Sequence, residues 1–252
     1  MNGKSLPGAA RRRVDRVAAA IALRARMLAN RGDAVQCPIC EHRFAHFRDA
    51  WNRPAAICWR CGSHERQRAL WLYLDRLHPE LLRDAGGLLH FAPEWCLERM
   101  LRRRAGLRYV TGDLDPAKAE LQLDITRLPL RDESFDAILC SHVLEHVEDD
   151  GAAMRELHRV LAPGGWLIVM VPLDTARAHT YEDPSIRSPA DREREFHQFD
   201  HVRLYSPDIA GRLRETGLSV VIERPAERLG PELTARHGLL ADDYLFMCRR
   251  SA

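Results

Sequence analysis

Four cysteines near the start of the chain have the spacing of a metal site. Cys37 and Cys40 form one C-x-x-C pair, Cys58 and Cys61 form a second, and 17 residues separate the two pairs. Each turn places two sulfurs on one edge of a tetrahedron, so two turns supply the four thiolates of a zinc site. Because four thiolates leave no coordination position open, we predict a structural zinc. A redox pair is the alternative, although thioredoxin-like C-x-x-C motifs occur singly.

A second group of reactive side chains follows a short apolar run at 135–140. Its members are Ser141, His142, Glu145 and His146. The apolar run predicts a buried parallel strand. After this polar loop, Ala153, Leu157, Val160 and Leu161 form one apolar stripe of a helix, and 166–171 predicts a second buried strand. Ligands bind beyond the carboxyl ends of such strands. We therefore expect Ser141 and His142 to lie at a ligand.

This segment resembles a known family. The letters FDAILCSHVLEHVED, followed by ELHRVLAPGGWLIV, are similar to the second half of a class I S-adenosylmethionine (SAM)-dependent methyltransferase of type 11. A narrower bacterial group also resembles the chain, because it has a zinc ribbon in front and a D-H-V-R-x-Y segment behind. The resemblance runs from about Cys37 to about Gly217. It implies an α/β fold with a Rossmann-like sheet, preceded by a small four-cysteine zinc ribbon.

The resemblance also implies a set of SAM-binding residues. They are His90, Ala92, Glu94, Asp113, Leu114, Asp124, Ile125, Ser141 and His142. Asp113 matches the position that binds the ribose hydroxyls, with Asp115 as competitor, and Asp124-Ile125 resembles the adenine-contacting pair. The first turn departs from the family, because the sequence H-F-A-P-E lacks the usual glycines. The start of the following helix still offers free N–H groups to a carboxylate.

The connection between the second and third strands is unusually short. Residues 113–124 include the ends of two strands as well as the connection between them. They are too few for a crossover helix, because the connection alone needs about a dozen residues. We therefore predict a shortened connection and a short third strand at 120–123. Between 173 and 200 the chain instead carries a long polar insertion, which is typical of a lid or substrate wall.

Histidines supply the candidate catalytic residues. If the acceptor must lose a proton, histidine suits the role of general base near neutral pH. His201 is the first choice, and Asp200 is the carboxylate expected to orient it. His142 is the second choice. His146 is equally well explained as a buried residue at the start of a helix. The resemblance supports a role for 196–205, which looks like the F-x-Q-x-D-H-V-R-x-Y segment of the narrower group, and for the T-Y-E-D letters at 180–183.

The sequence divides into three parts: a basic N-terminal helix at 1–32, a zinc ribbon at 33–62, and a methyltransferase domain at 63–252 with the insertion 173–200. The helix is expected to pack on the main domain, although it could serve as an RNA-binding or targeting arm. Aromatic residues of the ribbon, Phe44, Phe47, Trp51 and Trp59, could stack on nucleobases or form its core.

Composition narrows the function classes. The 252 residues carry 38 basic and 36 acidic side chains, a net charge of +2, which is not typical of a nucleic-acid binder. No membrane span or signal peptide is visible, and the paired cysteines favour a reducing cytoplasm. We expect a methyltransferase acting on an oxygen or nitrogen of a small molecule by in-line displacement. The alternatives are a ribosomal or transfer RNA methyltransferase and a non-catalytic binding module.

Overall fold

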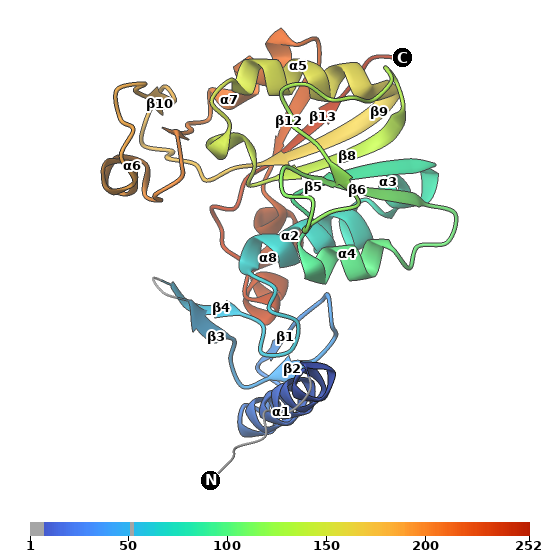
Figure 1. Ribbon diagram of the computed structural model, residues 1–252, viewed down its shortest axis with the longest axis vertical. Coiled ribbons are helices and arrows are strands. Elements are labelled where there is room, and N and C mark those ends of the chain that lie inside the picture. Colours follow the sequence, from blue (N-terminus) through green and yellow to red (C-terminus); the bar gives the residue numbers. More distant parts are fainter. Residues whose placement is uncertain (1–7, 51–52) are drawn as a thin grey trace.

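The structure, a computed structural model, describes residues 8–50 and 53–252 (Figure 1). The first seven residues of the predicted basic helix and Trp51 lie outside the described residues. Within the described ranges the chain forms a seven-stranded sheet with helices on both faces, and a smaller four-cysteine unit lies below it in Figure 1.

The central sheet has the strand order β12-β13-β9-β8-β5-β6-β7. Its strands are β5 (Gly87–Phe91), β6 (Arg108–Asp113), β7 (Leu121–Gln122), β8 (Phe135–Ser141), β9 (Leu161–Met170), β12 (Ser219–Glu223) and β13 (Leu245–Arg249). All neighbours are parallel except at β13, which is antiparallel to both β9 and β12. The predicted Rossmann-like sheet is confirmed, and its last two strands form an antiparallel pair.

Helices cover both faces of the sheet because successive strand residues point to opposite sides. Leu88 packs with α2 (Glu65–Leu72), α3 (Pro79–Asp84) and α4 (Trp95–Leu101), whereas Leu89 packs with α5 (Asp150–Val160) and α7 (Ile209–Glu215). The α2 helix continues as a π-helical turn, η1 (Tyr73–Leu77). Figure 1 shows α5 and α7 above the sheet and α2, α3 and α4 below it.

The edge of the sheet confirms the short second connection. Between β6 and β7 the structure has only turns, and β7 pairs with β6 over two residues. Asp113 accepts a hydrogen bond from the backbone N–H of Asp115 at 2.8 Å, and Thr111 Oγ1 accepts one from the N–H of Glu120 at 2.9 Å. These hydrogen bonds fix the turns of a connection that is too short to contain a crossover helix.

The four-cysteine unit consists of two small hairpins. In the first, β1 (Val35–Gln36) pairs with β2 (Arg43–Phe44), and in the second, β3 (Arg48–Ala50) pairs with β4 (Arg53–Ile57). Phe44 and Phe47 are fully buried. These two aromatic rings therefore form the core of the unit and are not free to stack on bases.

The N-terminal helix corrects one expectation. Helix α1 (Gly8–Ala29) lies beside the four-cysteine unit, at the end of the molecule farthest from the central sheet (Figure 1). Val17 and Ile21 are 54% and 64% exposed, whereas Met27 near the end of the helix is partly buried and packs against the core. The expected packing of this helix on the main domain is wrong for its described side chains, because those of Val17, Ile21 and Leu28 are exposed.

The insertion is ordered into a small subdomain. It contains β10 (Tyr181–Glu182) and α6 (Pro189–Phe196), and β10 pairs antiparallel with β11 (Arg203–Leu204). Figure 1 shows this subdomain extending from the side of the sheet near α7. The pairing joins the T-Y-E-D letters to the D-H-V-R-x-Y segment, two stretches that the sequence resemblance quoted separately.

A helix that was not predicted, α8 (Pro225–His237), follows β12 and runs toward the four-cysteine unit. Its C-terminal turn lies against that unit, where Arg236 pairs with Asp33 at 2.7 Å and His237 Nδ1 lies 2.8 Å from the carbonyl of Gln36. Residues near the end of the chain therefore hold the unit that its beginning forms.

Candidate functional site

A cleft of about 760 Å³ opens at the carboxyl ends of β5, β6 and β8. Its wall includes Phe91, Ala92, Gly112, Asp113, Leu114, Lys118, Leu123, Asp124, Ile125, Thr126, His142, Val143, His146, Val147, Glu148, Asp149 and Asp200. The volume falls within the range of sites for small ligands. Six of the predicted residues, Ala92, Asp113, Leu114, Asp124, Ile125 and His142, are thus brought together, as is Asp200.

Two strand ends reach the cleft through residues in the left-handed backbone region. Ala92 follows β5 with a φ of 46°, and His142 follows β8 with a φ of 55°. A residue with a side chain pays about 1–2 kcal/mol for this conformation, which glycine adopts freely. Ala92 therefore adopts a backbone conformation suited to the glycine that the sequence lacks in its first turn.

Two carboxylates face the cleft from neighbouring strand ends. Asp124 Oδ1 accepts hydrogen bonds from the side chain and backbone of Thr126, at 2.7 and 2.9 Å, and these bonds lower the pKa of Asp124. Asp113 has one oxygen bound to the local turn, and Leu114 beside it is 69% exposed. Carboxylates can accept hydrogen bonds from the hydroxyls and the amine of a nucleoside, and apolar side chains can contact its ring. The side chains of the cleft are therefore compatible with SAM.

Three predicted cofactor residues do not line the cleft. His90 is fully buried, with Nε2 at 3.0 Å from Glu94 Oε2 and Nδ1 at 2.8 Å from the hydroxyl of Tyr109. Although burial disfavours the Glu94 carboxylate, the hydrogen bond from His90 gives a net lowering of its pKa. Ser141 is also buried, at the end of β8. His90 and Glu94 thus bond to each other and not to the cleft.

The candidate catalytic residues form a cluster behind His142. Nδ1 of His142 lies 3.1 Å from Glu145 Oε1, and the rings of His146 and His201 are 4.8 Å apart. Asp200 lies 3.4 Å from Nδ1 of His146. The expected orientation of His201 by Asp200 is therefore wrong, because the carboxylate turns to the other imidazole. His201 is buried, and this burial lowers its pKa, so the ring is neutral at neutral pH.

Arg203 fixes the loop that carries this cluster. Its buried guanidinium donates hydrogen bonds to the carbonyls of Leu144, Val147 and Glu148. It also pairs with Glu182 at 2.9 Å across the β10–β11 hairpin. The R of the D-H-V-R-x-Y segment thus acts as a brace for the loop 142–149, which sequence spacing alone did not reveal.

Comparisons with known proteins agree with this geometry. Residues 98–169 match a family model described as a methyltransferase domain. The demethylmenaquinone methyltransferase of Mycobacterium marinum is 41% identical over 68 residues, 26% of this chain and 29% of that protein. The uncharacterized protein YafE of Escherichia coli is 49% identical over 43 residues, 17% of this chain and 21% of that one. The chain spans less than a third of the length of these curated relatives.

Solved structures share the fold. A SAM-dependent methyltransferase from Mesorhizobium loti has a TM-score of 0.51 at 20% identity, covering 72% of this chain and 98% of that one. The [4+2]-cyclase SpnF has a TM-score of 0.52 at 16% identity, covering 82% and 87%. The central domain has the fold of class I methyltransferases. Since a cyclase shares its architecture, the fold by itself does not determine the reaction.

The four cysteines in front of the central domain form a compact set. Their sulfurs lie within 4.8 Å of one another, and the Sγ atoms of Cys37 and Cys61, and of Cys40 and Cys58, are 3.6 Å apart. The edge of a zinc–thiolate tetrahedron is about 3.8 Å, so the set fits a zinc ion. Hydrogen bonds among the thiols lower the pKa of Cys37 and raise that of Cys40, so without a metal the four sulfurs share protons.

Small local features complete this predicted zinc ribbon. The hydroxyl of Ser63 lies 3.3 Å from the sulfurs of Cys37 and Cys61. Glu41 and Gly62 each follow the second cysteine of a pair, and both have positive φ angles, 62° and 72°. The two turns are thus equivalent, although only the second has the glycine that the conformation favours.

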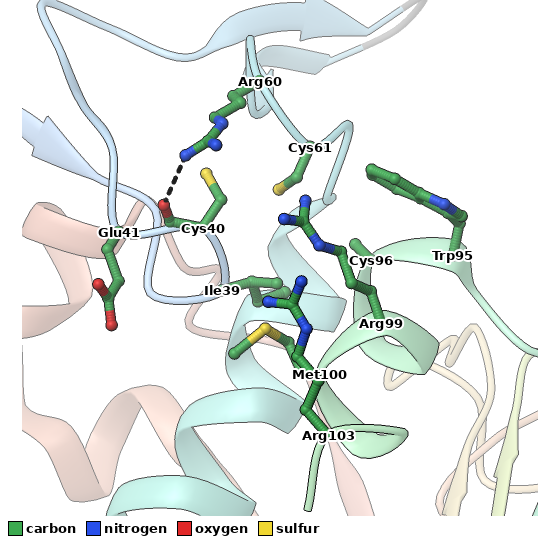
Figure 2. A pocket seen from close by; sticks show the side chains of 10 residues that line it. All are labelled: Ile39, Cys40, Glu41, Arg60, Cys61, Trp95, Cys96, Arg99, Met100 and Arg103. Carbon is green, nitrogen blue, oxygen red and sulfur yellow. Dashed lines mark hydrogen bonds between the residues drawn. The ribbon is translucent and has the colours of Figure 1, made fainter.

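A second pocket lies between the ribbon and α4 (Figure 2). It has a volume of about 240 Å³ and contains the side chains of Arg60, Arg99 and Arg103, with Trp95 at its rim. None of the three arginines forms an ion pair with a carboxylate of the described residues. Zinc bound by four thiolates carries a net charge of −2, which nearby guanidinium groups would offset.

Proposed function

We propose that this chain is a SAM-dependent methyltransferase that acts on an oxygen or nitrogen of a small-molecule acceptor. The observation that carries the proposal is the position of Asp113 and Asp124 at neighbouring strand ends, lining one cleft together with Ala92 and His142. This arrangement provides polar contacts for a nucleoside on one side and an imidazole on the other.

SAM bound in this cleft would supply a methyl group on a positively charged sulfur, which is already a good leaving group. The task of the chain is then to hold the acceptor in line with the carbon–sulfur bond, and such positioning supplies much of the rate. His142 lines the cleft and is suited to receive an acceptor proton. A small acceptor is supported by the relatives named demethylmenaquinone methyltransferase and by the net charge of +2.

Calorimetry with S-adenosylhomocysteine tests the cofactor part of the proposal. We expect binding by the wild-type chain and an affinity at least tenfold lower for Asp113→Asn, because a neutral amide is a weaker acceptor for ribose hydroxyls. Asp132→Asn is the control, since Asp132 lies before β8 at the opposite end of the sheet. Absence of binding would leave a non-catalytic module as the remaining alternative.

Host extract fractions incubated with the chain and methyl-labelled SAM would identify the acceptor. A labelled small molecule is the expected product, and label confined to RNA would replace the first proposal with an RNA methyltransferase. The latter alternative is favoured by one observation, the three arginines without carboxylate partners in the pocket beside the ribbon. RNA binding through them would weaken steeply with salt.

A further inference from the structure

Three side chains behind the cleft wall bring metal-ligating atoms together. One carboxylate oxygen of Glu145 and one ring nitrogen each of His146 and His201 lie within 4.8 Å of one another. With metal–ligand bonds of about 2.1 Å, ligands on opposite sides of one ion are separated by about 4 Å. Small side-chain rotations would therefore close these three ligands on a single ion.

Glu145 is the second, independent observation. Its side chain is 2% exposed, and neither carboxylate oxygen has a hydrogen-bond donor among the described residues. The approach of His142 Nδ1 to 3.1 Å is close but not aligned as a hydrogen bond. Burying a carboxylate without donors costs several kcal/mol, and a bound cation would offset that cost.

Both histidines are oriented for metal binding by their other nitrogen. His201 Nδ1 lies 3.1 Å from the carbonyl oxygen of Phe196, which only accepts hydrogen bonds, so Nδ1 carries the proton and Nε2 keeps its lone pair. Nδ1 of His146 lies 3.4 Å from the Asp200 carboxylate, an ion-pair contact that is not aligned as a hydrogen bond. An oxygen acceptor behind each imidazole is the usual support of a metal-binding histidine.

We propose that Glu145, His146 and His201 bind a divalent first-row transition-metal ion at the wall of the cleft. Two imidazoles and one carboxylate leave further coordination positions open, and nitrogen ligands disfavour magnesium and calcium. The site is separate from the four cysteines of the ribbon, which leave no position open.

The position of the site has a consequence that rests on the proposed function. His146 lines the cleft, so an ion held there would meet an acceptor beside the methyl donor. A divalent ion lowers the pKa of a hydroxyl that it binds, which favours an oxygen acceptor. The hydroxyl proton would pass to His142, the oxygen would bond to the methyl carbon, and the carbon–sulfur bonding pair would remain on sulfur, leaving S-adenosylhomocysteine.

Titration of the zinc-loaded chain with Co²⁺ tests the site. We expect one Co²⁺ per chain by calorimetry, with the weak visible absorption of nitrogen and oxygen ligands and without strong thiolate bands. Glu145→Gln and His146→Gln should each weaken Co²⁺ binding at least tenfold. His179→Gln is the control, because His179 is an exposed histidine whose one carboxylate contact, with Asp208, lies outside the cluster.

Two results would overturn the metal site: no Co²⁺ binding by the zinc-loaded wild type, or equal affinity in all three variants. Calorimetry with S-adenosylhomocysteine on the same samples shows that the variants are folded, and it separates the two proposals. Nucleoside binding without Co²⁺ binding would reject only the metal site, whereas Co²⁺ binding without nucleoside binding would reject only the proposed function.

Discussion

The Nε of Arg68 donates a hydrogen bond to the carbonyl oxygen of His237 at 2.7 Å, across 169 residues of sequence. The same guanidinium donates to the carbonyls of Ala56, Ser63 and Gly238 and lies 4.0 Å from the ring centroid of Phe47. This fully buried side chain therefore joins the ribbon, α2 and the end of α8.

Replacing Arg68 should have a large effect on stability. In Arg68→Met the carbonyls of Ala56, Ser63, His237 and Gly238 each lose a charged donor, and we expect a loss of about 3–5 kcal/mol in the free energy of unfolding. Urea denaturation measures it. Arg83→Met is the control, because that side chain is 70% exposed and should change stability by less than about 0.5 kcal/mol. Equal effects of the two substitutions would contradict the role of Arg68 in joining the ribbon, α2 and α8.

Backbone strain at the first turn predicts a stabilising substitution. Ala92→Gly should raise the free energy of unfolding by up to about 1 kcal/mol, because glycine adopts the φ of 46° without steric cost. Ala152→Gly within α5 should instead lower it by about 1 kcal/mol. Thermal melts of both variants check the opposite signs, and a destabilised Ala92→Gly chain would argue against strain at this turn.

Removal of the metal from the ribbon tests whether the four cysteines hold a structural zinc. Chelation should release one tightly held zinc per chain, and Cys58→Ser should lower zinc content and stability, because the ribbon has few buried residues besides its aromatic core. Metal analysis and thermal melts measure both effects. Cys248→Ser, at a buried cysteine of β13, should keep the zinc; loss of zinc from this variant alone would reject the four-cysteine assignment.

The pH dependence of stability should carry a signature of Asp243. Burial, with the charges of Glu65 and Asp242, raises the pKa of Asp243 to about 7, and its Oδ2 has no hydrogen-bond partner among the described residues. An unfolded aspartate ionises near pH 4, so between about pH 4 and 7 the folded state holds a proton that the unfolded state has lost.

The contribution of Asp243 to the free energy of unfolding therefore falls as the pH rises from about 4 to about 7 and then levels off. Asp243→Asn should remove this component and be more stable than the wild type at pH 8. Urea denaturation across the pH range is the measurement, with exposed Asp132→Asn as control. A wild-type profile that Asp243→Asn leaves unchanged would show that the carboxyl is ionised throughout.

The brace at Arg203 gives a test of the loop 142–149. Arg203→Lys keeps the charge but loses the fork that reaches three carbonyls, so the loop should lose its fixed geometry. We expect Co²⁺ affinity to fall at least tenfold, and S-adenosylhomocysteine affinity to fall as well, because residues of this loop line the cleft. Arg194→Lys, on the exposed face of α6, is the matched control. Unchanged Co²⁺ affinity in Arg203→Lys would show that the loop holds its shape without the brace.

No helix of the described residues is long and apolar enough to cross a membrane. The apolar stretch of α1 from Val17 to Leu23 lies between Arg16 and Arg24 and is too short for such a span.

The sequence by itself determined where several strands lie along the chain and the type of the domain. Apolar runs such as 135–140 specify buried strands because both faces of a parallel sheet are covered, and two C-x-x-C pairs specify a zinc geometry because each turn fixes two sulfurs. The short segment 113–124 excluded a crossover helix by length alone. All of these are local constraints.

Tertiary structure alone decided which of these residues meet. His201 and Glu145 are 56 positions apart, and Asp200 pairs with His146 because the β10–β11 hairpin and Arg203 set the approach of the two loops. Arg68 reaches α8 for a similar reason, across a contact between distant ends of the chain. Spacing along a sequence fixes only nearby atoms, whereas a site assembled from several loops depends on how the whole sheet positions them.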